Sequence, residues 1–325
     1  MNYVTYQQKD CLTGCIVNVL RSKGLPCSEA DILLYGGGFL IRYRTITTPE
    51  NTKYLIYGEL REACFNFLQS IGVRYEYQDY GSPEEASAHY IAAKEQGAGV
   101  IFAVRADCID YHPIFHQASD SQHCLTILHL DPERNTAAVS DGYIPSTPVS
   151  KYEGNMPLDR LLAGYEHANF STVTVYPLTE IPSFRRADET AMLRDVLQAY
   201  IEPPKSDGIY YGKDAVLQLC DDLFLIQDWE KEAFSAKMFD FNTVYKTWGF
   251  IGAKRILAEL CSERQCLKPY AEAMDDIAEK WNGLSRLIVK IAICGRSSML
   301  EGFRSKVQEL VHREETLYAE ILAAL

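Results

Sequence analysis

The hydrophobic pattern of the chain changes near residue 185, and this change constrains the fold more than any other feature. Before that point, short apolar runs typical of strands lie at residues 99–104, 125–130 and 171–176, separated by turn-rich segments. After Pro182, apolar residues recur three and four positions apart, as on one face of a helix. They are Leu267, Tyr270, Met274, Ile277, Trp281, Leu284, Ile288 and Ile291, followed by Leu300, Phe303, Val307, Leu310, Leu317 and Ile321. The pattern predicts an α+β fold: a domain of residues 1–182 with an antiparallel sheet, then an all-α domain of residues 183–325 in which no strand is expected.

Helical segments in the first domain are predicted to begin near residues 11, 28, 58 and 82. The last of these has the clearest start signal. Ser82 supplies a side-chain acceptor at the N-cap, Pro83 suits the first helical position, and Glu85 stands three residues after the cap. The first helix is expected to end near Gly24 and the fourth near Gln96.

Composition limits the class of protein. No stretch supplies the roughly 18 uninterrupted apolar residues of a membrane span, and the N-terminus lacks the basic and apolar segments of a secretory signal. The ten cysteines are spread over 325 residues without the framework spacing of a secreted domain, which predicts free thiols in the cytoplasm. A net charge of −12 argues against non-specific nucleic-acid binding. We expect a soluble protein whose partner is a small molecule or another protein.

The segment from Gln7 to Cys11 stands immediately before the first predicted helix. A thiol at a helix start lies near unpaired backbone N–H groups and the positive end of the helix dipole, which favours the thiolate. Cys11 is therefore a candidate nucleophile, whereas Cys15, one turn further on, is expected to pack in the core. The amide of Gln7 or Gln8 is a candidate donor to an oxyanion. The alternative reading of Cys11 is a half-buried residue at a helix start.

A predicted hairpin brings a second pair of residues together. His123 opens one strand, residues 131–135 form a turn, and the returning strand ends at Asp141. Pairing of the two strands would place the carboxylate beside the imidazole. The carboxylate would then hold one ring nitrogen protonated and leave the other to accept a thiol proton. His123 is the candidate base and Asp141 the residue that orients it.

Two further segments are candidates for substrate binding. Asp107 and Tyr111 belong to a polar and aromatic cluster that can line a pocket or form an ordinary loop. Gly37, Gly38 and Phe39 end a glycine run that can form a wall near the nucleophile or a simple turn between helix and strand. A zinc site can also be read from the cluster, with these ligands: Cys108, His112, His116 and His123. Pro113 interrupts the helical spacing of its histidines and no Cys-x-x-Cys occurs, so we predict no metal.

The order of these residues is similar to that in papain-like cysteine enzymes, including peptidase domains that process bacteriocin leaders. Three stretches more closely resemble the butirosin biosynthesis protein H family: DCLTGCIVNVLRSKGLPCSEADILLYGGGFLIRYR, DCIDYHPIFHQASDSQHCLTILHLDPERNTAAVSDGY, and TWGFIGAKRILAEL through EKWNGLSRLIVK. The resemblance covers most of the chain and implies a papain-like first domain with Cys11 as nucleophile, His123 as base and Asp141 as orienting acid. Leu12 stands where a glycine often follows the cysteine of the peptidases, which makes leader cleavage the weaker expectation.

The family resemblance implies transfer of an acyl group from a carrier-protein thioester to an amine, as in the capping of an aminoglycoside antibiotic. The expected partners are an acyl carrier protein or peptidyl carrier domain and a small-molecule amine. No cofactor is expected beyond a phosphopantetheine arm that enters as part of the substrate. Candidate contacts for an acidic carrier protein, or for the phosphate of its phosphopantetheine arm, are Arg42, Arg44, Arg185 and Arg186.

Two other functional classes remain open. A thioesterase or amidase would use the same residues, and a non-catalytic binding module would keep the same helix and hairpin. The apolar ladder around Trp281 can be helix core or part of a homodimer surface.

Overall fold

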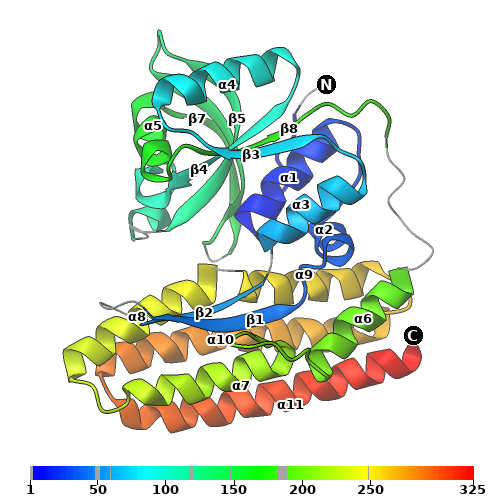
Figure 1. The fold of residues 1–325 in the computed structure, drawn as a ribbon, viewed down its shortest axis with the longest axis vertical. Helices are drawn as coiled ribbons and strands as arrows, with labels where there is room; N and C mark the ends of the chain where they lie inside the picture. The colour runs from blue at the N-terminus through cyan, green and yellow to red at the C-terminus, as the bar shows by residue number, and fades with distance from the viewer. Residues whose placement is uncertain are drawn as a thin grey trace. The chain divides into compact units, whose positions relative to one another are not determined.

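The computed structural model describes residues 3–47, 52–58, 60–117, 121–146, 148–181, 189–247 and 249–325. The chain divides into two compact units, and Figure 1 shows their elements. The first unit comprises Met1–Ile32 and Cys64–Phe184, and the second comprises Leu33–Ala63 and Arg185–Leu325. The predicted boundary between residues 182 and 183 stays a prediction. The units differ from it in one respect, because Leu33–Ala63 groups with the C-terminal helices.

The first unit contains a six-stranded sheet in which every neighbouring pair is antiparallel. Its strands are β3 (Tyr75–Asp79), β4 (Gly99–Arg105), β5 (Gln122–Asp131), β6 (Thr136–Ile144), β7 (Ser150–Pro157) and β8 (Ser171–Val175). Their order across the sheet is β3-β8-β4-β5-β6-β7. The three strand runs predicted from sequence correspond to β4, β5 and β8, and the predicted hairpin is β5 with β6.

Helices cover both faces of this sheet (Figure 1). Helix α1 (Cys11–Ser22) packs on β5 and β6, while α5 (Leu158–His167) packs on β4, β6 and β7. Gly99 allows α1 to approach, since a Cβ there would lie 2.5 Å from Val19 Cγ1. Successive side chains of a strand point to opposite faces, so Phe102, three residues after Gly99, points away from α1. It stacks on Tyr165 of α5 with ring centroids 3.9 Å apart. The α1 face of the sheet therefore carries the candidate nucleophile.

The remaining helices of the N-terminal region are α2 (Glu29–Gly36), α3 (Leu60–Ser70) and α4 (Pro83–Glu95). The start signal of α4 is confirmed, because the Glu85 backbone N–H donates to Ser82 Oγ at 3.2 Å. The predicted starts of the other helices lie within two residues of those found. Local capping chemistry and periodicity were sufficient for these elements.

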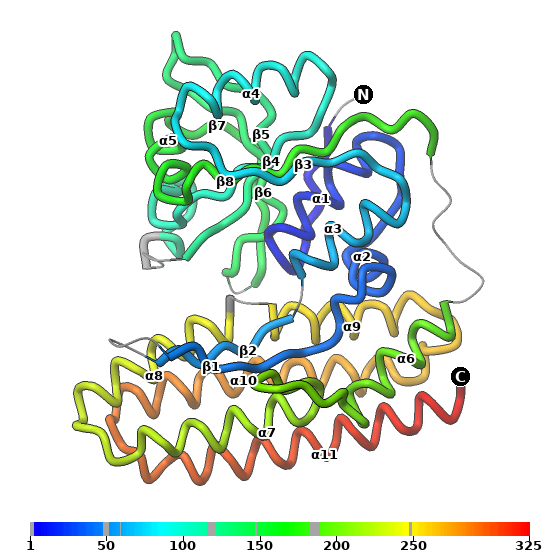
Figure 2. The backbone as a smooth tube through the Cα atoms, viewed as in Figure 1, coloured from blue at the N-terminus to red at the C-terminus, as the bar shows by residue number. Residues whose placement is uncertain are grey.

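The second unit is mostly helical and also holds a small sheet. Its helices are α6 (Glu189–Ile201), α7 (Gly212–Leu223), α8 (Lys231–Thr247), α9 (Phe250–Glu263), α10 (Ala271–Cys294) and α11 (Leu300–Ala324). The sheet has the order β2-β1-β9, with β1 (Ile41–Thr47), β2 (Thr52–Gly58) and β9 (Tyr210–Tyr211). Figure 2 shows the blue β1–β2 hairpin among the green-to-red helices of this unit. Trp281 on α10 is fully buried, which supports the interpretation that the apolar residues around it are helix core.

The expectation of no strand after residue 182 was wrong at one place, the two-residue strand β9. Tyr210 pairs with Tyr43, and Tyr211 pairs with Arg42, whose guanidinium lies 5.2 Å from the Tyr211 ring centroid. Two residues are too few to show an alternating pattern, so only the pairing with a distant segment creates this strand.

The glycine run at the end of α2 has a packing explanation. A Cβ on Gly36 would lie 2.1 Å from the carbonyl oxygen of Ala63, and one on Gly38 would lie 2.7 Å from the Ala63 Cβ. Gly37 has a φ of +79°, a conformation that favours glycine. These observations support the reading of a turn. Within the described residues, no helix combines the length and the apolarity needed to cross a membrane.

Candidate active site

Cys11 is the first residue of α1, and its thiol is partly buried. Asp10 caps the helix, because its Oδ1 accepts hydrogen bonds from the backbone N–H groups of Leu12 and Thr13, each at 3.0 Å. This cap fixes the first turn and satisfies two of the N–H groups that a helix start leaves unpaired. The sulfur therefore has a defined position at the positive end of the helix dipole.

Glu29 holds the segment that leads into α1, a role that the sequence analysis missed. Its carboxylate accepts from the backbone N–H groups of Lys9 (2.8 Å) and Asp10 (3.0 Å) and from Thr13 Oγ1 (2.6 Å). Only 2% of Glu29 is exposed. Burial, partly offset by the bond from Thr13, raises its pKa to about 8. Burial, together with the charge of Cys11, raises the pKa of Asp10 to about 7.

These two carboxyl groups make the stability of the unit depend on pH. Because the folded pKa of Glu29 is about 8, against an ordinary value of 4.5, the folded chain binds a proton between these values that the unfolded chain releases. This contribution to stability is present below pH 4.5 and is lost as the pH rises through 8. Asp10 contributes with the same sign between 3.8 and about 7. In Glu29→Gln, we expect the midpoint of thermal unfolding to fall less between pH 5.5 and 8 than in the wild type.

The exposed Glu84 on α4 provides the control for this prediction. Glu84→Gln should keep the wild-type slope of midpoint against pH, since the side chain of Glu84 is in solvent and lies away from Glu29 and Asp10 in the sequence. A Glu29→Gln slope equal to that of the wild type would show that Glu29 is ionised throughout this range.

His123 and Asp141 meet as the hairpin predicts. His123 Nε2 lies 2.9 Å from Asp141 Oδ2. Only 5% of the surface of His123 and 0% of that of Asp141 is exposed. The register explains the contact: Thr126 pairs with Ser140 across β5 and β6, so the start of β5 lies beside the later part of β6. The backbone N–H of Tyr143 donates to the other oxygen, Oδ1, at 2.9 Å. The carboxylate therefore holds Nε2 and leaves Nδ1 as the ring nitrogen for a second partner.

That second partner is Cys11. A hydrogen bond from the Cys124 thiol lowers the pKa of Cys11, burial opposes this, and the hydrogen bond and charge of His123 add to the lowering. Burial disfavours the imidazolium, but the charge and hydrogen bond of Asp141, with those of Cys11, outweigh it and raise the pKa of His123 to about 10. The pKa of Cys124 is raised, mainly by its bond to Cys11, so Cys124 stays a thiol and donates. Both directions favour a thiolate at Cys11 beside an imidazolium at His123.

The segment that holds this arrangement also matches a known family. Residues 10–142 match the family described as Butirosin biosynthesis protein H, N-terminal, and this span contains Cys11, His123 and Asp141. The match supports a relationship between this N-terminal segment and that family. Among curated proteins, none matches the chain.

The two glutamines before the matched butirosin biosynthesis protein H region differ in environment. The side chain of Gln7 is exposed. Gln8 is buried, its Nε2 donates to Asn18 Oδ1 at 3.3 Å, and its backbone N–H donates to the Gly142 carbonyl at 2.8 Å. Gln8 thus also ties the entry of α1 to the end of β6. The oxyanion role of either residue stays a prediction.

The predicted substrate residues have structural partners. Asp107 Oδ1 accepts from Arg105 Nε at 2.6 Å, and the Tyr111 hydroxyl donates to Asp141 Oδ2 at 2.6 Å. Gly37, Gly38 and Phe39 belong to the other compact unit. Substrate contacts by these residues stay predictions. Arg44 is exposed on β1, while Arg185 and Arg186 lie outside the described residues.

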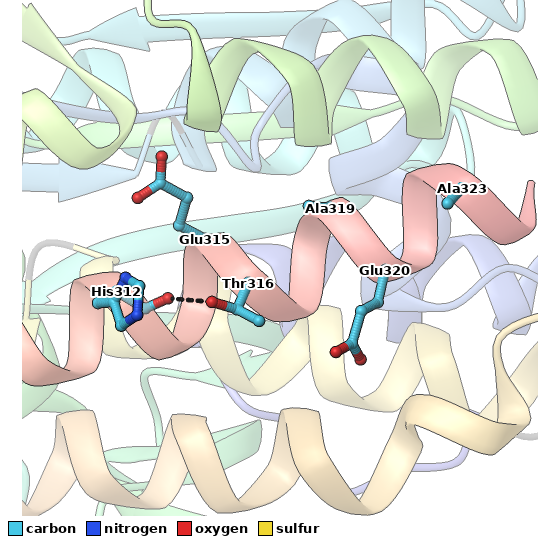
Figure 3. Close-up of a pocket in the computed structure, with 6 residues that line it drawn as sticks. All are labelled: His312, Glu315, Thr316, Ala319, Glu320 and Ala323. Carbon is cyan, nitrogen blue, oxygen red and sulfur yellow. Dashed lines mark hydrogen bonds between the residues drawn. The ribbon is translucent and has the colours of Figure 1, made fainter.

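A metal centre and a surface hollow would be two other kinds of site. Among the described residues, no group of three or more His, Cys, Asp or Glu side chains is arranged to hold a metal ion. A surface hollow on α11 is shown in Figure 3, where Glu315, Ala319 and Ala323 follow one another along one edge of the helix and Glu320 lies on the other edge. The hydrogen bond drawn there is from Thr316 Oγ1 to the His312 carbonyl and lies within the helix. None of the predicted site residues lines this hollow.

Proposed function

We propose that this protein is a biosynthetic acyltransferase that moves an acyl group from a carrier-protein thioester to an amine. The observation that carries the proposal is the contact of Cys11 with His123, whose other ring nitrogen is bound to the buried carboxylate of Asp141. A thiolate beside an oriented imidazolium is the pair that covalent acyl transfer requires. The family match supports a role in biosynthesis, since the family is named for butirosin formation.

The first step forms an acyl-enzyme. The Cys11 thiolate attacks the thioester carbonyl, a new S–C bond forms, and the negative charge moves to the carbonyl oxygen. Collapse of this intermediate breaks the bond to the pantetheine sulfur, and His123 gives that leaving thiolate its Nδ1 proton. The products are an acyl-Cys11 thioester, a free carrier thiol and a neutral imidazole.

The second step releases the amide. The amine attacks the acyl-Cys11 carbonyl, and the neutral His123 takes the proton that the amine loses. The bond to Cys11 then breaks, which restores the thiolate and the imidazolium. The Asp141 carboxylate keeps its hydrogen bond to His123 in both steps and stabilises the imidazolium whenever it forms.

An oxyanion forms in both steps next to the start of α1. The Asp10 side chain caps the backbone N–H groups of Leu12 and Thr13, so the backbone N–H of Cys11 is our candidate for the first donor to this oxyanion. A glutamine amide at position 7 or 8 would add a second donor. Removal of one such donor typically lowers the rate by about 10²- to 10³-fold.

The experiment uses the full chain, an acyl phosphopantetheinyl carrier protein and a panel of amines. Intact-mass analysis should show an acyl adduct on the enzyme that disappears when an amine is added, with an amide as product. Free acid as the sole product with every amine would identify a hydrolase and overturn transfer. Absence of any adduct and of any product would favour a binding module.

Matched cysteine variants assign the adduct. Cys11→Ala should abolish both the adduct and the amide. Cys266→Ala removes an exposed thiol far along the chain and should retain both. If the adduct persisted in Cys11→Ala and disappeared in Cys266→Ala, the acylation would be a side reaction of an accessible thiol.

A further inference from the structure

The carboxylate of Asp141 has a third donor besides His123 and the Tyr143 backbone. The Tyr111 hydroxyl donates to Oδ2 at 2.6 Å, so Tyr111 and His123 share one carboxylate oxygen. Asp141 is 0% exposed, and a buried carboxylate remains charged only where such donors replace water. Tyr111 comes from the loop before β5, about 30 residues from Asp141 in sequence.

The ring of Tyr111 is held by its neighbours. It stacks on Tyr152 of β7 with ring centroids 4.0 Å apart and an angle of 3° between the planes. Tyr152 pairs with Asp141 across β6 and β7, and its own hydroxyl donates to the Asn155 carbonyl at 2.7 Å. Gly154 makes room for it, because a Cβ there would lie 2.6 Å from the Tyr152 hydroxyl oxygen. The sheet therefore fixes the ring that aims the Tyr111 hydroxyl.

Phe115 covers the same pair of residues. Its ring centroid lies 4.8 Å from that of His123 and 5.8 Å from that of Tyr111, the latter in an edge-to-face contact. An apolar ring at this distance limits the access of water, which strengthens the hydrogen bonds that it covers.

We propose that Tyr111 is a positioning residue that acts through Asp141: its hydroxyl fixes the carboxylate oxygen on which His123 depends and so keeps the imidazole aligned with Cys11. This inference rests on the proposed function of the same site. It replaces contact with substrate as the main role of Tyr111. Without the hydroxyl, the carboxylate loses one of three donors and gains freedom to rotate, and His123 loses its fixed partner.

The other titratable groups around His123 and Asp141 come from three elements. They are Asp10, Cys11 and Cys15 from α1 and its cap, Cys124 from β5, and Tyr152 from β7. All of these residues are kept in Tyr111→Phe. A change in the titration of Cys11 in that variant therefore reports the link from Tyr111 through Asp141.

The test measures alkylation of Cys11 by iodoacetamide between pH 4 and 9, with the modified peptide identified by mass. In Tyr111→Phe, we expect the apparent pKa of Cys11 to rise by about 0.5 to 1 unit, because one of three hydrogen bonds to the carboxylate is lost. The rate at a pH below both pKa values should fall by roughly 3- to 10-fold. The measurement needs no acyl donor, so its failure and the failure of acyl transfer are distinguishable.

Two controls separate positioning from a general effect on structure. Tyr152→Phe loses a hydroxyl from the same stacked pair but not from Asp141, and it should titrate as the wild type does. Asp141→Asn removes the residue through which Tyr111 acts, so adding Tyr111→Phe to it should cause no further shift. An unchanged titration in Tyr111→Phe, or an equal shift in the Asp141→Asn background, would overturn the proposal.

A further variant covers the case in which Tyr111→Phe does not fold. Tyr152→Leu removes the stacked ring and leaves the Tyr111 hydroxyl in place. The apparent pKa of Cys11 should then rise above the wild-type value, because the Tyr111 hydroxyl is held less firmly toward Asp141. The rise should be smaller than that expected for loss of the hydroxyl itself. A titration identical to that of the wild type would contradict the proposal.

Discussion

Replacement of His123 by alanine is expected to lower the rate of acyl-enzyme formation by about 10²- to 10⁴-fold, the usual contribution of a positioned acid and base. Two effects act together. The Cys11 thiolate loses the imidazolium that stabilises it, and the leaving thiolate loses its proton donor. The apparent pKa of Cys11 should rise toward the ordinary cysteine value of about 8.5. Single-turnover mass analysis with an acyl-carrier thioester measures the rate, and the pH dependence of alkylation measures the pKa.

His129 offers a matched control on the same strand. It is exposed on β5, six residues beyond His123. His129→Ala should leave the rate and the titration of Cys11 within about two-fold of the wild type, as expected for a surface substitution away from special contacts. A His123→Ala enzyme with normal acylation at pH 7 would show that another group supplies the proton, and the proposed mechanism would be wrong.

Replacement of Glu314 by glutamine is expected to destabilise the helical unit by about 3 to 5 kcal/mol, because it leaves a buried cation without its counter-charge. Glu314 on α11 is 0% exposed and forms an ion pair with Lys254 of α9, which is 3% exposed. Burial lowers the pKa of Lys254, and Glu314 offsets part of that lowering. Urea unfolding followed by circular dichroism at the helical signal measures the change in free energy.

The other contacts of Glu314 explain why the pair tolerates burial. Its oxygens also accept from the hydroxyls of Tyr200 and Tyr318, each at 2.6 Å, and from Trp281 Nε1 at 3.2 Å. The Lys254 ammonium lies 4.5 Å from the Tyr200 ring centroid. The side chains of one lysine, two tyrosines and one tryptophan thus meet at the Glu314 carboxylate, so its loss affects packing among α6, α9, α10 and α11.

The neighbouring residue provides the control for Glu314. Glu315 is paired with Lys213 at 2.5 Å, and its side chain is 33% exposed. Glu315→Gln should cost less than about 1 kcal/mol, because water stabilises both separated charges. Equal losses in the two variants would indicate that the helix, and not the buried pair, is the source of the effect.

Local signals were sufficient for most elements and for the candidate pair of the active site. Ser82, Pro83 and Glu85 mark the start of α4 through contacts made within four residues. The hairpin of β5 and β6 follows from the turn signal of residues 131–135, of which 132–135 connect the paired strands, and the hairpin brings His123 to Asp141. The helix start at Cys11 follows from periodicity and from Asp10, whose capping bonds reach only to Thr13.

Residues whose roles depend on distant partners were missed or assigned differently. Glu29 bonds the backbone before α1 from about 20 residues away, and its own sequence neighbourhood indicates only a helix start. Tyr111 is a candidate for substrate binding from the sequence, which stays a prediction, and its bond to Asp141 was not foreseen because it depends on the convergence of β6, β7 and the loop before β5. No spacing rule connects such residues, since the chain between them has no fixed length.

The sequence by itself determined most of the periodic elements and the places of the candidate site residues on them, because helix starts, hairpins and amphipathic faces are specified by residues close together in the chain. Only the tertiary structure decided which side chains surround Asp141, that β9 pairs with β1, and that Leu33–Ala63 groups with the C-terminal helices. The physical reason is that burial and long-range hydrogen bonds depend on which surfaces meet, and that outcome is set by the packing of the whole unit.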